Sequence, residues 1–431
     1  MTLARSLAVA LTLILAHQTQ AQTMPAPETV RLDQLQLMKG FPPPADKQVT
    51  AENFLTQFPN LRWAFHHMRE LLPSRNIRRG PLVPEPLPSG EDLRAKIDAL
   101  SFTGPDGNSL TFRQYLDSTY ADATLIMKDG KVVYEAYHEG MPAENPHMLW
   151  SVTKSFGGLI ATQLLEEGTL KADALITGYV PELETSGWSG ATVQQLLNMT
   201  ADIDYSEIYA DEESDVIKYA LSAGMLPTPE GFVGERDLYS YLPTIGADGA
   251  HGERFIYRTV HTEVLGWVLR RATGQHLADL ISERIWSKLG AEQDAYLLLD
   301  SKGTEWAGAG LNATLRDLGR FGEMMRNEGY FNGQQIVNSS VIASIREGAD
   351  REAFKASGRD YQPGYSYRNK WWISHNADGA YEALGVHGQM IHVNPTVGLV
   401  VVRLSSHPVA TSAVTFPITR PALAALADML R

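Results

Sequence analysis

Short apolar runs near the two ends of the chain predict strands that belong to one sheet. Residues 123–127 and 131–137 are both strand-like, and the Asp-Gly step at 129–130 supplies the positive φ that a tight hairpin requires. A second pair follows far downstream, at 390–394 and 399–404, with asparagine, proline and glycine at the turn. These two pairs are the candidates for the central strands of the domain.

Helical patterns occupy most of the chain between and after these strands. They cover residues 150–167, 192–199, 261–273 and 421–430, and the first and third end at a glycine, which suits a helix C-terminus. Strands at both ends with helices between them predict an α/β fold. We expect an antiparallel sheet built from N- and C-terminal strands, flanked by helices, with an inserted subdomain that is mostly helical.

The same patterns divide the chain into an N-terminal extension and a catalytic domain. Residues 22–92 are proline-rich and only weakly helical, and we expect them to form an extension or linker that wraps the catalytic body. The catalytic domain is predicted over residues 93–431. Its α/β part covers 93–165 and 300–431, and the helical insert covers 166–299.

The first 21 residues have the pattern of a secretory signal peptide. Arg5 gives a positive start, residues 7–16 are apolar, and residues 19–21 present small side chains where signal peptidase would cut. An uncleaved anchor is the alternative, but the apolar run is too short to span a bilayer. We therefore expect a secreted or periplasmic protein without a stable membrane anchor.

Composition excludes several classes of function. The net charge of −13 and the absence of a Lys/Arg-rich run argue against nucleic acid as a partner, because the field of the protein repels polyanions. The chain has no cysteine, which excludes disulfides, thiolate nucleophiles and cysteine-based zinc sites. With no zinc spacing and no phosphate-binding glycine loop, neither a metal nor an organic cofactor is expected. The oligomeric state is not predicted.

The strongest chemical signal is a serine followed three residues later by a lysine at the start of a predicted helix. Residues three apart share a helix face, so the Ser151 hydroxyl and the Lys154 amine can meet. Burial beside Trp150 and Phe156 would lower the pKa of the lysine enough for it to act as a base. Alone the motif is weak, since a capping serine with an exposed lysine gives the same letters.

Two later segments strengthen this interpretation. Tyr257 precedes a predicted helix at the end of an extended run, where a phenol near an ammonium can pass protons to a leaving group. The segment Gly385-Val386-His387 enters a strand, and the N–H groups of Val386 and Ser151 would form an oxyanion hole. Ordinary packing of the tyrosine and an ordinary glycine-rich turn remain the alternatives.

The order of these features resembles the serine β-lactamase and penicillin-recognising superfamily. Its class C-like branch and related esterases are the most similar, and within it the chain resembles the 6-aminohexanoate-dimer (nylon-oligomer) hydrolases. The resemblance extends from about Leu110 to Val402 and rests on several ordered blocks, namely residues 151–155, 196–200, 204–209, 310–314 with Arg316-Asp317, and 385–389.

The resemblance implies a role for each matching residue. Ser151 matches the nucleophile, Lys154 the base and Tyr257 the proton-shuttling phenol, while Val386 matches the oxyanion-hole position. Tyr209 matches a loop tyrosine that closes over substrate in the nylon-oligomer branch, although a tyrosine in such a polar loop is otherwise simply a surface residue.

The chain departs from the β-lactamase pattern at two places. Thr259 stands where β-lactamases have asparagine, and Ala383-Leu384-Gly385 replaces the Lys-Thr-Gly motif that binds the β-lactam carboxylate. These departures weigh against a dedicated β-lactamase or D-alanyl peptidase. Thr259, Gly385 and His387 are candidates for substrate contact, and His387 either substitutes partly for the missing cation or packs in the interior.

Three hypotheses on function follow. The first is a secreted carboxylesterase or amidase that acts on small-molecule esters or linear amides through an acyl-enzyme at Ser151. The second is a periplasmic D-amino-acid peptidase or weak β-lactamase. The third is a non-catalytic binding protein on the same scaffold, which the retained Ser151, Lys154 and Tyr257 disfavour.

Overall fold

A computed structural model describes residues 24–84, 86–138 and 140–431. The predicted signal peptide, residues 1–21, lies outside these ranges. Within them, no helix combines the length and the apolar composition that crossing a bilayer requires.

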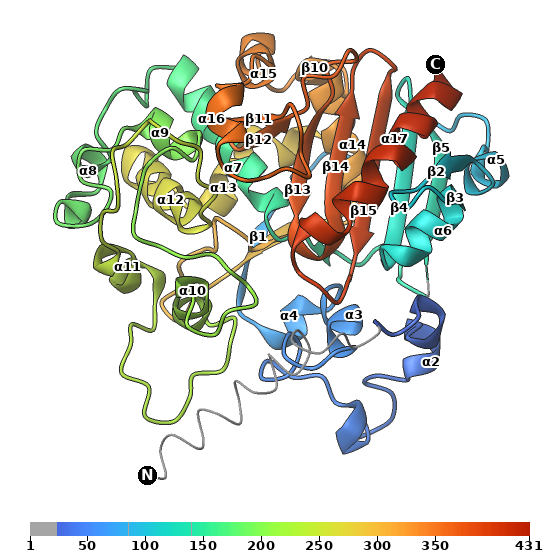
Figure 1. Cartoon of the computed structure of the whole chain (residues 1–431), viewed down its shortest axis with the longest axis horizontal. Helices are drawn as coiled ribbons and strands as arrows, with labels where there is room; N and C mark the ends of the chain where they lie inside the picture. Colours follow the sequence, from blue (N-terminus) through green and yellow to red (C-terminus); the bar gives the residue numbers. More distant parts are fainter. Residues whose placement is uncertain (1–23, 85, 139) are drawn as a thin grey trace.

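The largest sheet has seven strands and joins distant parts of the chain (Figure 1). Each strand runs antiparallel to its neighbours. The order across the sheet is β11 (Ser366–Arg368), β12 (Trp371–Ile373), β13 (Tyr381–Gly385), β14 (Gln389–Asn394), β15 (Leu399–Ser405), β4 (Ala121–Lys128) and β5 (Lys131–Tyr137). The predicted sheet of N- and C-terminal strands is confirmed, because β15 pairs with β4 along its length. The predicted hairpin between β4 and β5 is confirmed as well, with Asp129 and Gly130 at positive φ.

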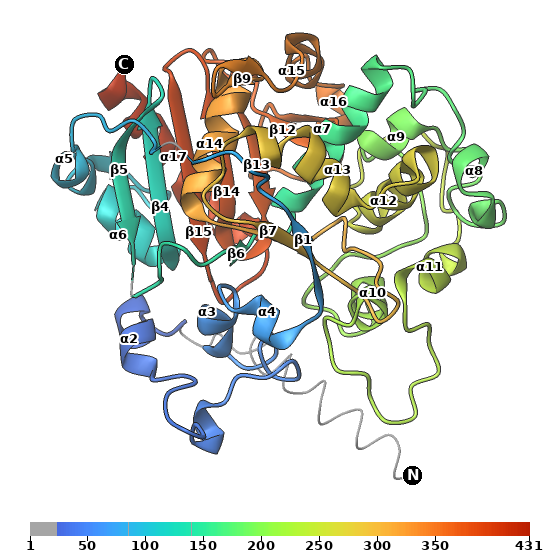
Figure 2. The same ribbon diagram turned by 180° about the vertical axis from the view of Figure 1, so that it is seen from behind.

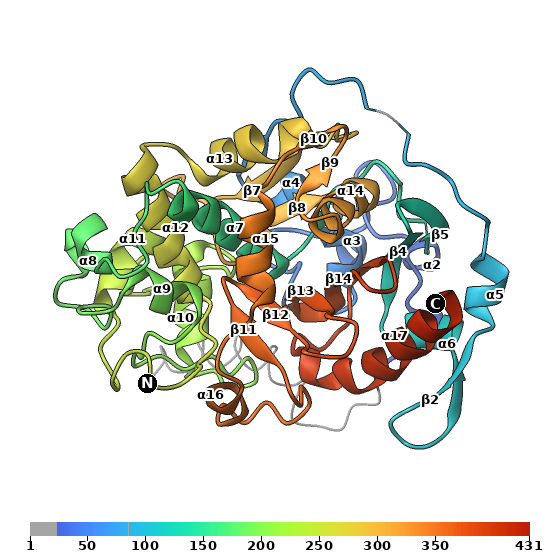
Figure 3. The same cartoon turned by 90° about the horizontal axis from the view of Figure 1, so that it is seen from above.

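Helices cover both faces of this sheet, which explains why its strands are almost continuously apolar. Alternate strand residues enter different cores: Leu125 and Val400 pack in one, Ile126 and Val401 in the other. The first core includes α7 (Val152–Glu166) and α14 (Leu315–Arg326). The second includes α5 (Arg94–Asp98), α6 (Phe112–Ser118) and α17 (Phe416–Leu430). Figure 3 shows α14 and α17 on opposite sides of the sheet.

The middle of the chain forms the predicted helical region beside the sheet. Its helices are α8 (Ile176–Tyr179), α9 (Val193–Leu197), α10 (Asp215–Ala223), α11 (Leu238–Tyr241), α12 (Val260–Thr273) and α13 (Leu277–Arg284). The predicted end of α12 is confirmed, since Gly274 caps it at a φ of 72°. Helix α7 is buried on nearly all sides rather than amphipathic, because it lies between this region and the sheet.

A second, smaller sheet ties the N-terminal segment to the catalytic body (Figure 2). Its antiparallel order is β1 (Ser74–Ile77), β7 (Ala295–Leu298), β8 (Leu311–Ala313) and β6 (His147–Met148). Strand β1 was not predicted, and the weak helical pattern before it forms only short helices, among them α3 (Asn60–Ala64) and α4 (Met68–Leu71). Phe54 and Phe65 of the same segment are fully buried in the main core.

The remaining elements are short or peripheral. They are η1 (Pro27–Thr29), α2 (Leu32–Leu35), η2 (Ala45–Lys47), β2 (Ser101–Thr103), β3 (Ser109–Thr111), η3 (Pro181–Leu183), η4 (Leu242–Thr244), η5 (Trp286–Lys288), β9 (Tyr330–Phe331), β10 (Gln334–Gln335), α15 (Ser339–Arg346), α16 (Arg351–Lys355), η6 (Val386–Gly388) and η7 (Ser412–Val414).

Candidate active site

Ser151 lies at a sharp turn between β6 and α7. Trp150, immediately before it, has a φ of 49°, a left-handed conformation that is unfavourable for a bulky side chain. Helix α7 begins at Val152, and the Ser151 hydroxyl makes no capping hydrogen bond to the helix. The turn therefore presents the hydroxyl to the cavities described below while keeping it at a helix N-terminus, where negative charge is stabilised.

Lys154 meets Ser151 on the same face of α7, as the spacing predicts. Its Nζ lies 2.8 Å from Ser151 Oγ, 2.7 Å from the Gly308 carbonyl oxygen and 3.2 Å from Thr259 Oγ1. The side chain is buried, with 1% exposure. Burial lowers the pKa of Lys154 to about 8, against the opposing effect of nearby carboxylates. A neutral amine is thus accessible beside the serine hydroxyl.

Tyr257 joins these two residues from the loop before α12. Lys154 Nζ lies 5.2 Å from the centroid of its ring, and the ring stacks on Trp372 at a centroid distance of 5.4 Å. Burial raises the pKa of Tyr257, and an interaction with the Ser151 hydroxyl opposes that shift. The structure therefore brings the hydroxyl, the amine and the phenol together, with Ser151 and Tyr257 bordering one cavity and Lys154 buried beneath them.

Glu207 is a site residue that the sequence interpretation missed. Its carboxylate accepts hydrogen bonds from the Thr259 N–H at 2.5 Å, the Thr259 hydroxyl at 2.7 Å and the Tyr209 hydroxyl at 2.9 Å. Thr259 in turn accepts one from Lys154. Thr259 therefore links Lys154 to Glu207. The available signal was the position of Glu207, two residues before Tyr209 in one of the family-like blocks.

Glu263 is the second residue that was missed. Its carboxylate accepts hydrogen bonds from the backbone N–H groups of Ala307, at 2.9 Å, and Gly308, at 3.0 Å, and from the Tyr219 hydroxyl, at 2.6 Å. Burial raises its pKa. A Cβ at Gly308 would lie 2.8 Å from Glu263 Oε1, so the loop can approach only as glycine. Glu263 lies one helical turn after Thr259. It holds the Gly308 loop in place, and with it the carbonyl group that binds Lys154.

Gly385 and Val386 lie where β13 ends, beside the turn that carries Ser151. A Cβ at Gly385 would lie 2.5 Å from the Leu149 carbonyl oxygen, so this glycine allows two backbones to approach. The sequence analysis proposed that Gly385 contacts substrate, whereas in the structure its close contact is with the backbone of Leu149. Val386 follows at the start of η6 and borders the same cavities as Ser151.

His387 packs in the interior rather than supplying a cation. Its Nδ1 lies 2.7 Å from the His407 carbonyl oxygen, and its ring contacts those of Phe65 and Trp150. Burial lowers the pKa of His387 to about 4, so the imidazole is neutral at pH 7. It cannot replace the positive charge of the missing Lys-Thr-Gly motif, and the packing alternative is the one that the geometry favours.

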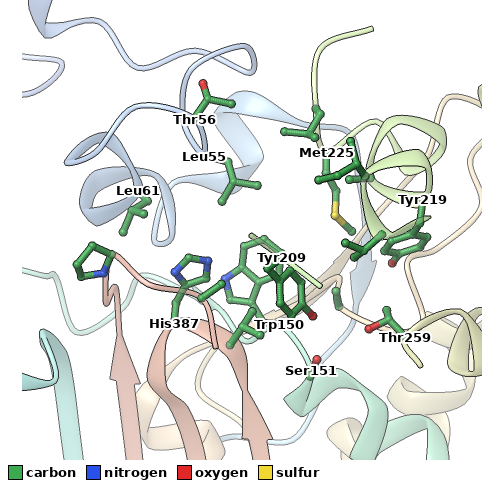
Figure 4. Close-up of a pocket in the computed structure, with 18 of the residues that line it drawn as sticks. Leu55, Thr56, Leu61, Trp150, Ser151, Tyr209, Tyr219, Met225, Thr259 and His387 are labelled. Carbon is green, nitrogen blue, oxygen red and sulfur yellow. The ribbon is translucent and has the colours of Figure 1, made fainter. Parts of the chain in front are cut away.

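Two cavities meet at Ser151. One, of about 170 Å³, is largely apolar and is shown in Figure 4, where Leu55 and Leu61 lie above Ser151. The other, of about 420 Å³, is polar. Ser151, Tyr209 and Val386 border both cavities. Tyr209 therefore lies beside the candidate nucleophile and is not a remote surface residue.

No metal centre accompanies these residues. Across the ranges that the structure describes, no three or more histidine, aspartate or glutamate side chains are grouped to hold a metal ion.

Comparison with known proteins assigns the fold and the catalytic class. The beta-lactamase family model matches residues 110–425, nearly three quarters of the chain. The chain belongs to the beta-lactamase family. It is therefore an enzyme, a hydrolase of the group that includes serine esterases and amidases, and the alternative of a non-catalytic binding protein is set aside.

Two relatives of this beta-lactamase-family hydrolase share most of its length. The 6-aminohexanoate-dimer hydrolase of Paenarthrobacter ureafaciens is 36% identical over 353 residues, covering 81% of this chain and 86% of the relative. A solved structure described as a candidate 6-aminohexanoate-dimer hydrolase from Bacillus anthracis is 32% identical, with a TM-score of 0.81, covering 90% of this chain and 98% of the other.

A more distant structure shares the fold alone. EstCE1, a hydrolase with promiscuous acyltransferase activity, is 18% identical with a TM-score of 0.57, covering 74% of this chain and 96% of its own.

Proposed function

We propose that this protein is an exported serine hydrolase that cleaves ester or amide bonds through an acyl-enzyme on Ser151. The observation that carries the proposal is the 2.8 Å contact between Ser151 Oγ and the Nζ of a buried lysine whose pKa is lowered. A buried amine in its neutral form is a competent base, and the adjacent hydroxyl is the group that it would activate.

Acylation begins when neutral Lys154 takes the proton of the Ser151 hydroxyl as Oγ attacks the substrate carbonyl carbon. The resulting oxyanion accepts hydrogen bonds from the N–H groups of Ser151 and Val386. Tyr257 gives its phenolic proton to the departing nitrogen or oxygen and regains a proton from Lys154. The bond between carbonyl and leaving group breaks, and the acyl group stays on Ser151.

Deacylation repeats these steps with water as the nucleophile. Tyr257 and Lys154 take a proton from water as its oxygen attacks the acyl carbonyl, and the proton passes to Ser151 Oγ as the carboxylic acid leaves. The links from Lys154 to Thr259 and Gly308 hold the amine in place through both halves of the cycle.

The names of the two relatives that share most of the length of this chain indicate linear amides as part of the substrate range. Both are described by 6-aminohexanoate-dimer hydrolysis. We propose linear amides and simple esters as substrates. The missing Lys-Thr-Gly motif and the neutral imidazole of His387 weigh against the alternative of a D-amino-acid peptidase or β-lactamase.

Replacing the nucleophile tests the proposal. Ser151→Ala should abolish both p-nitrophenyl butyrate hydrolysis and labelling by a fluorophosphonate probe, since both need Oγ. Ser109→Ala, on an exposed strand residue, is the matched control and should retain both. Intact-mass analysis should find the phosphonyl group on the wild type alone. Wild-type turnover in the Ser151→Ala variant would refute the assignment.

Export is tested by the mature N-terminus. Expression of the full chain in a bacterial host should yield a periplasmic protein whose first residue follows Ala21. An intact Met1 on cytoplasmic protein would contradict export without affecting the chemistry.

A further inference from the structure

One of the two cavities at Ser151 is apolar and the other is polar. This difference limits which chemical groups the two halves of the substrate can carry. The smaller one is bordered by aliphatic side chains from two distant segments, including Leu55, Leu61, Val216, Ile217, Met225 and Leu226. Among the described residues that border it, none is an aspartate, glutamate, lysine or arginine. Its polar groups are neutral, including the Tyr219 hydroxyl, which donates to Glu263, and the His387 imidazole.

A charged group would be unfavourable in this apolar cavity. An ammonium placed there would lose its hydration and find no bordering carboxylate. An uncharged aliphatic chain gains from the same surroundings. A cavity of about 150 Å³ accommodates benzene, so the 170 Å³ here suits a group of about six carbon atoms.

The N-terminal segment supplies one wall of this cavity. Leu55, Thr56 and Leu61 lie on the opposite side from Ser151 (Figure 4), and Phe54 anchors the segment in the core with 1% exposure. The family model matches residues 110–425, so part of the wall of this cavity comes from residues outside the matched region. Those residues contribute to its selectivity.

The position of Tyr257 indicates which half of the substrate enters which cavity. Tyr257 borders the polar cavity and not the apolar one. Under the proposed mechanism it protonates the leaving group, so the leaving group must occupy the polar cavity. The acyl group then extends into the apolar one.

Three arginines and two carboxylates border the polar cavity, and both carboxylates already have partners. Glu207 accepts hydrogen bonds from Thr259 and Tyr209, and Asp248 pairs with Arg254. The other two arginines suit an anionic leaving group.

The Arg359 guanidinium lies 5.1 Å from the ring centroids of both Tyr257 and Trp372. It donates a hydrogen bond to the Tyr361 hydroxyl, and among the described residues it is not in an ion pair with a carboxylate. Arg258 also borders the cavity, and its Nε is buried without a hydrogen-bond partner among the described residues. Arg254, by contrast, is already paired with Asp202 and Asp248.

We propose that the enzyme prefers amides and esters that join an uncharged aliphatic acyl chain of about six carbons to a leaving group bearing a carboxylate. Arg359, aided by Arg258, binds the carboxylate, and the apolar cavity binds the acyl chain. The inference rests on the proposed acyl-enzyme at Ser151. It separates this chain from its named relatives, because the 6-aminohexanoate dimer carries an ammonium at the end of its acyl part.

Three matched amides test both halves of the preference. N-hexanoyl-6-aminohexanoate, the 6-aminohexanoate dimer and N-hexylhexanamide differ only in a terminal ammonium or a terminal carboxylate. We expect kcat/KM to be highest for the first. The dimer should fall at least about tenfold below it because its ammonium loses hydration, and the neutral amide about tenfold because a charge-assisted contact is lost.

Variants assign each preference to its cavity. Ile217→Asp places a carboxylate in the apolar cavity and should invert the ratio between the dimer and the hexanoyl substrate. Arg359→Gln should reduce the ratio between the carboxylate substrate and the neutral amide to near one, with Arg359→Lys restoring part of it. Arg94→Gln, at an exposed position of α5, is the matched control and should leave both ratios unchanged.

Each half of the proposal can be overturned separately. Hydrolysis of the dimer at or above the rate of the hexanoyl substrate would overturn the acyl half. A carboxylate preference that survives in Arg359→Gln, or is absent from the wild type, would overturn the leaving-group half. Failure of the underlying serine mechanism would look different, since the wild type would then neither react with fluorophosphonate nor turn over p-nitrophenyl acetate.

Discussion

Two buried clusters of ionisable groups lie close to the turn that carries Ser151, and their charges are arranged in opposite ways. In the first, Lys154 has a lowered pKa and Glu263 a raised one, so both are held toward their neutral forms. In the second, Asp122 lies 3.5 Å from Arg62 and 3.2 Å from His147, and these partners lower its pKa despite complete burial.

The difference lies in the contacts and not in the depth of burial. Lys154 touches hydroxyls and a carbonyl but no carboxylate within ion-pair distance among the described residues. Asp122 faces a guanidinium, an imidazole and the Ser406 hydroxyl. Desolvation therefore prevails at Lys154, and opposite charge prevails at Asp122. The first arrangement suits proton transfer, and the second joins the N-terminal segment to the sheet and to β6.

The largest expected effect is the loss of chemistry when the lysine is removed. Lys154→Ala should lower kcat/KM for p-nitrophenyl butyrate by about 10⁴-fold, because the base and the nucleophile act as a unit. The variant should still fold, as circular dichroism and thermal melting can check. A decrease in kcat/KM of less than tenfold would show that Lys154 is not the base. The two clusters would then not differ in function as proposed.

The corresponding change in the second cluster should reduce stability rather than chemistry. Asp122→Ala leaves the buried Arg62 and His147 without their shared carboxylate and should lower the free energy of unfolding by about 3–5 kcal/mol in urea titrations. The half-exposed pair of Asp117 and Arg113 is the control, and Asp117→Ala should cost no more than about 1 kcal/mol. Equal losses in the two variants would show that Asp122 is not a buried anchor.

The two clusters should also differ in their response to pH. Activity should rise with pH through the lowered pKa of Lys154, near 8, because the base is the neutral amine. The carboxylate of Glu207 raises that pKa, so Glu207→Gln should move the rise in the kcat/KM profile to lower pH, whatever it does to the plateau. A shift to higher pH would contradict the proposed coupling.

At Asp122 the pH dependence should appear in stability, with the same sign as the activity profile but in a much more acidic range. Its folded pKa is depressed, so the stabilisation is present above the unfolded value of 3.8 and is lost as pH falls through the folded pKa. Urea unfolding measured between pH 6 and strong acid should show this loss in the wild type. In Asp122→Ala the free energy of unfolding should change less steeply with pH. An unchanged slope would assign the acid sensitivity to other carboxyl groups.

The smallest expected effect concerns Tyr209. Tyr209→Phe removes one hydrogen bond to Glu207 and one hydroxyl beside Ser151, and should lower kcat/KM for an amide by about tenfold. The effect on p-nitrophenyl esters should be smaller, because their leaving group needs less assistance. Equal decreases for amide and ester would make Tyr209 a structural residue of the loop.

Local patterns in the sequence were enough to predict part of the site and most of the sheet. The contact between Ser151 and Lys154 needs only helical spacing, and the hairpin of β4 and β5 needs only the turn at Asp129. Both features arise within a few residues of chain. The two terminal strand pairs were expected in one sheet, but the direct pairing of β15 with β4 was not specified, and β11, β12 and β13 were not predicted.

Features that depend on long-range contacts escaped prediction. Glu207 sits in a polar loop where acidic residues usually face water, and its role depends on Thr259, 52 residues away. Glu263 depends in the same way on the loop at Gly308, 45 residues away. The wall formed by Leu55 and Leu61 has no periodicity that would place it beside Ser151. These contacts are set by tertiary packing, which local sequence patterns do not predict.

The pairing of β15 with β4 also makes the candidate active site depend on both ends of the catalytic domain. Val386 borders the cavities at Ser151 from a segment whose neighbouring strands pair with a hairpin more than 250 residues earlier in the chain. A chain that ended before β13 would retain Ser151 and Lys154 but lack the second donor of the proposed oxyanion hole. Under the proposed mechanism such a truncated protein would bind esters and amides without hydrolysing them efficiently.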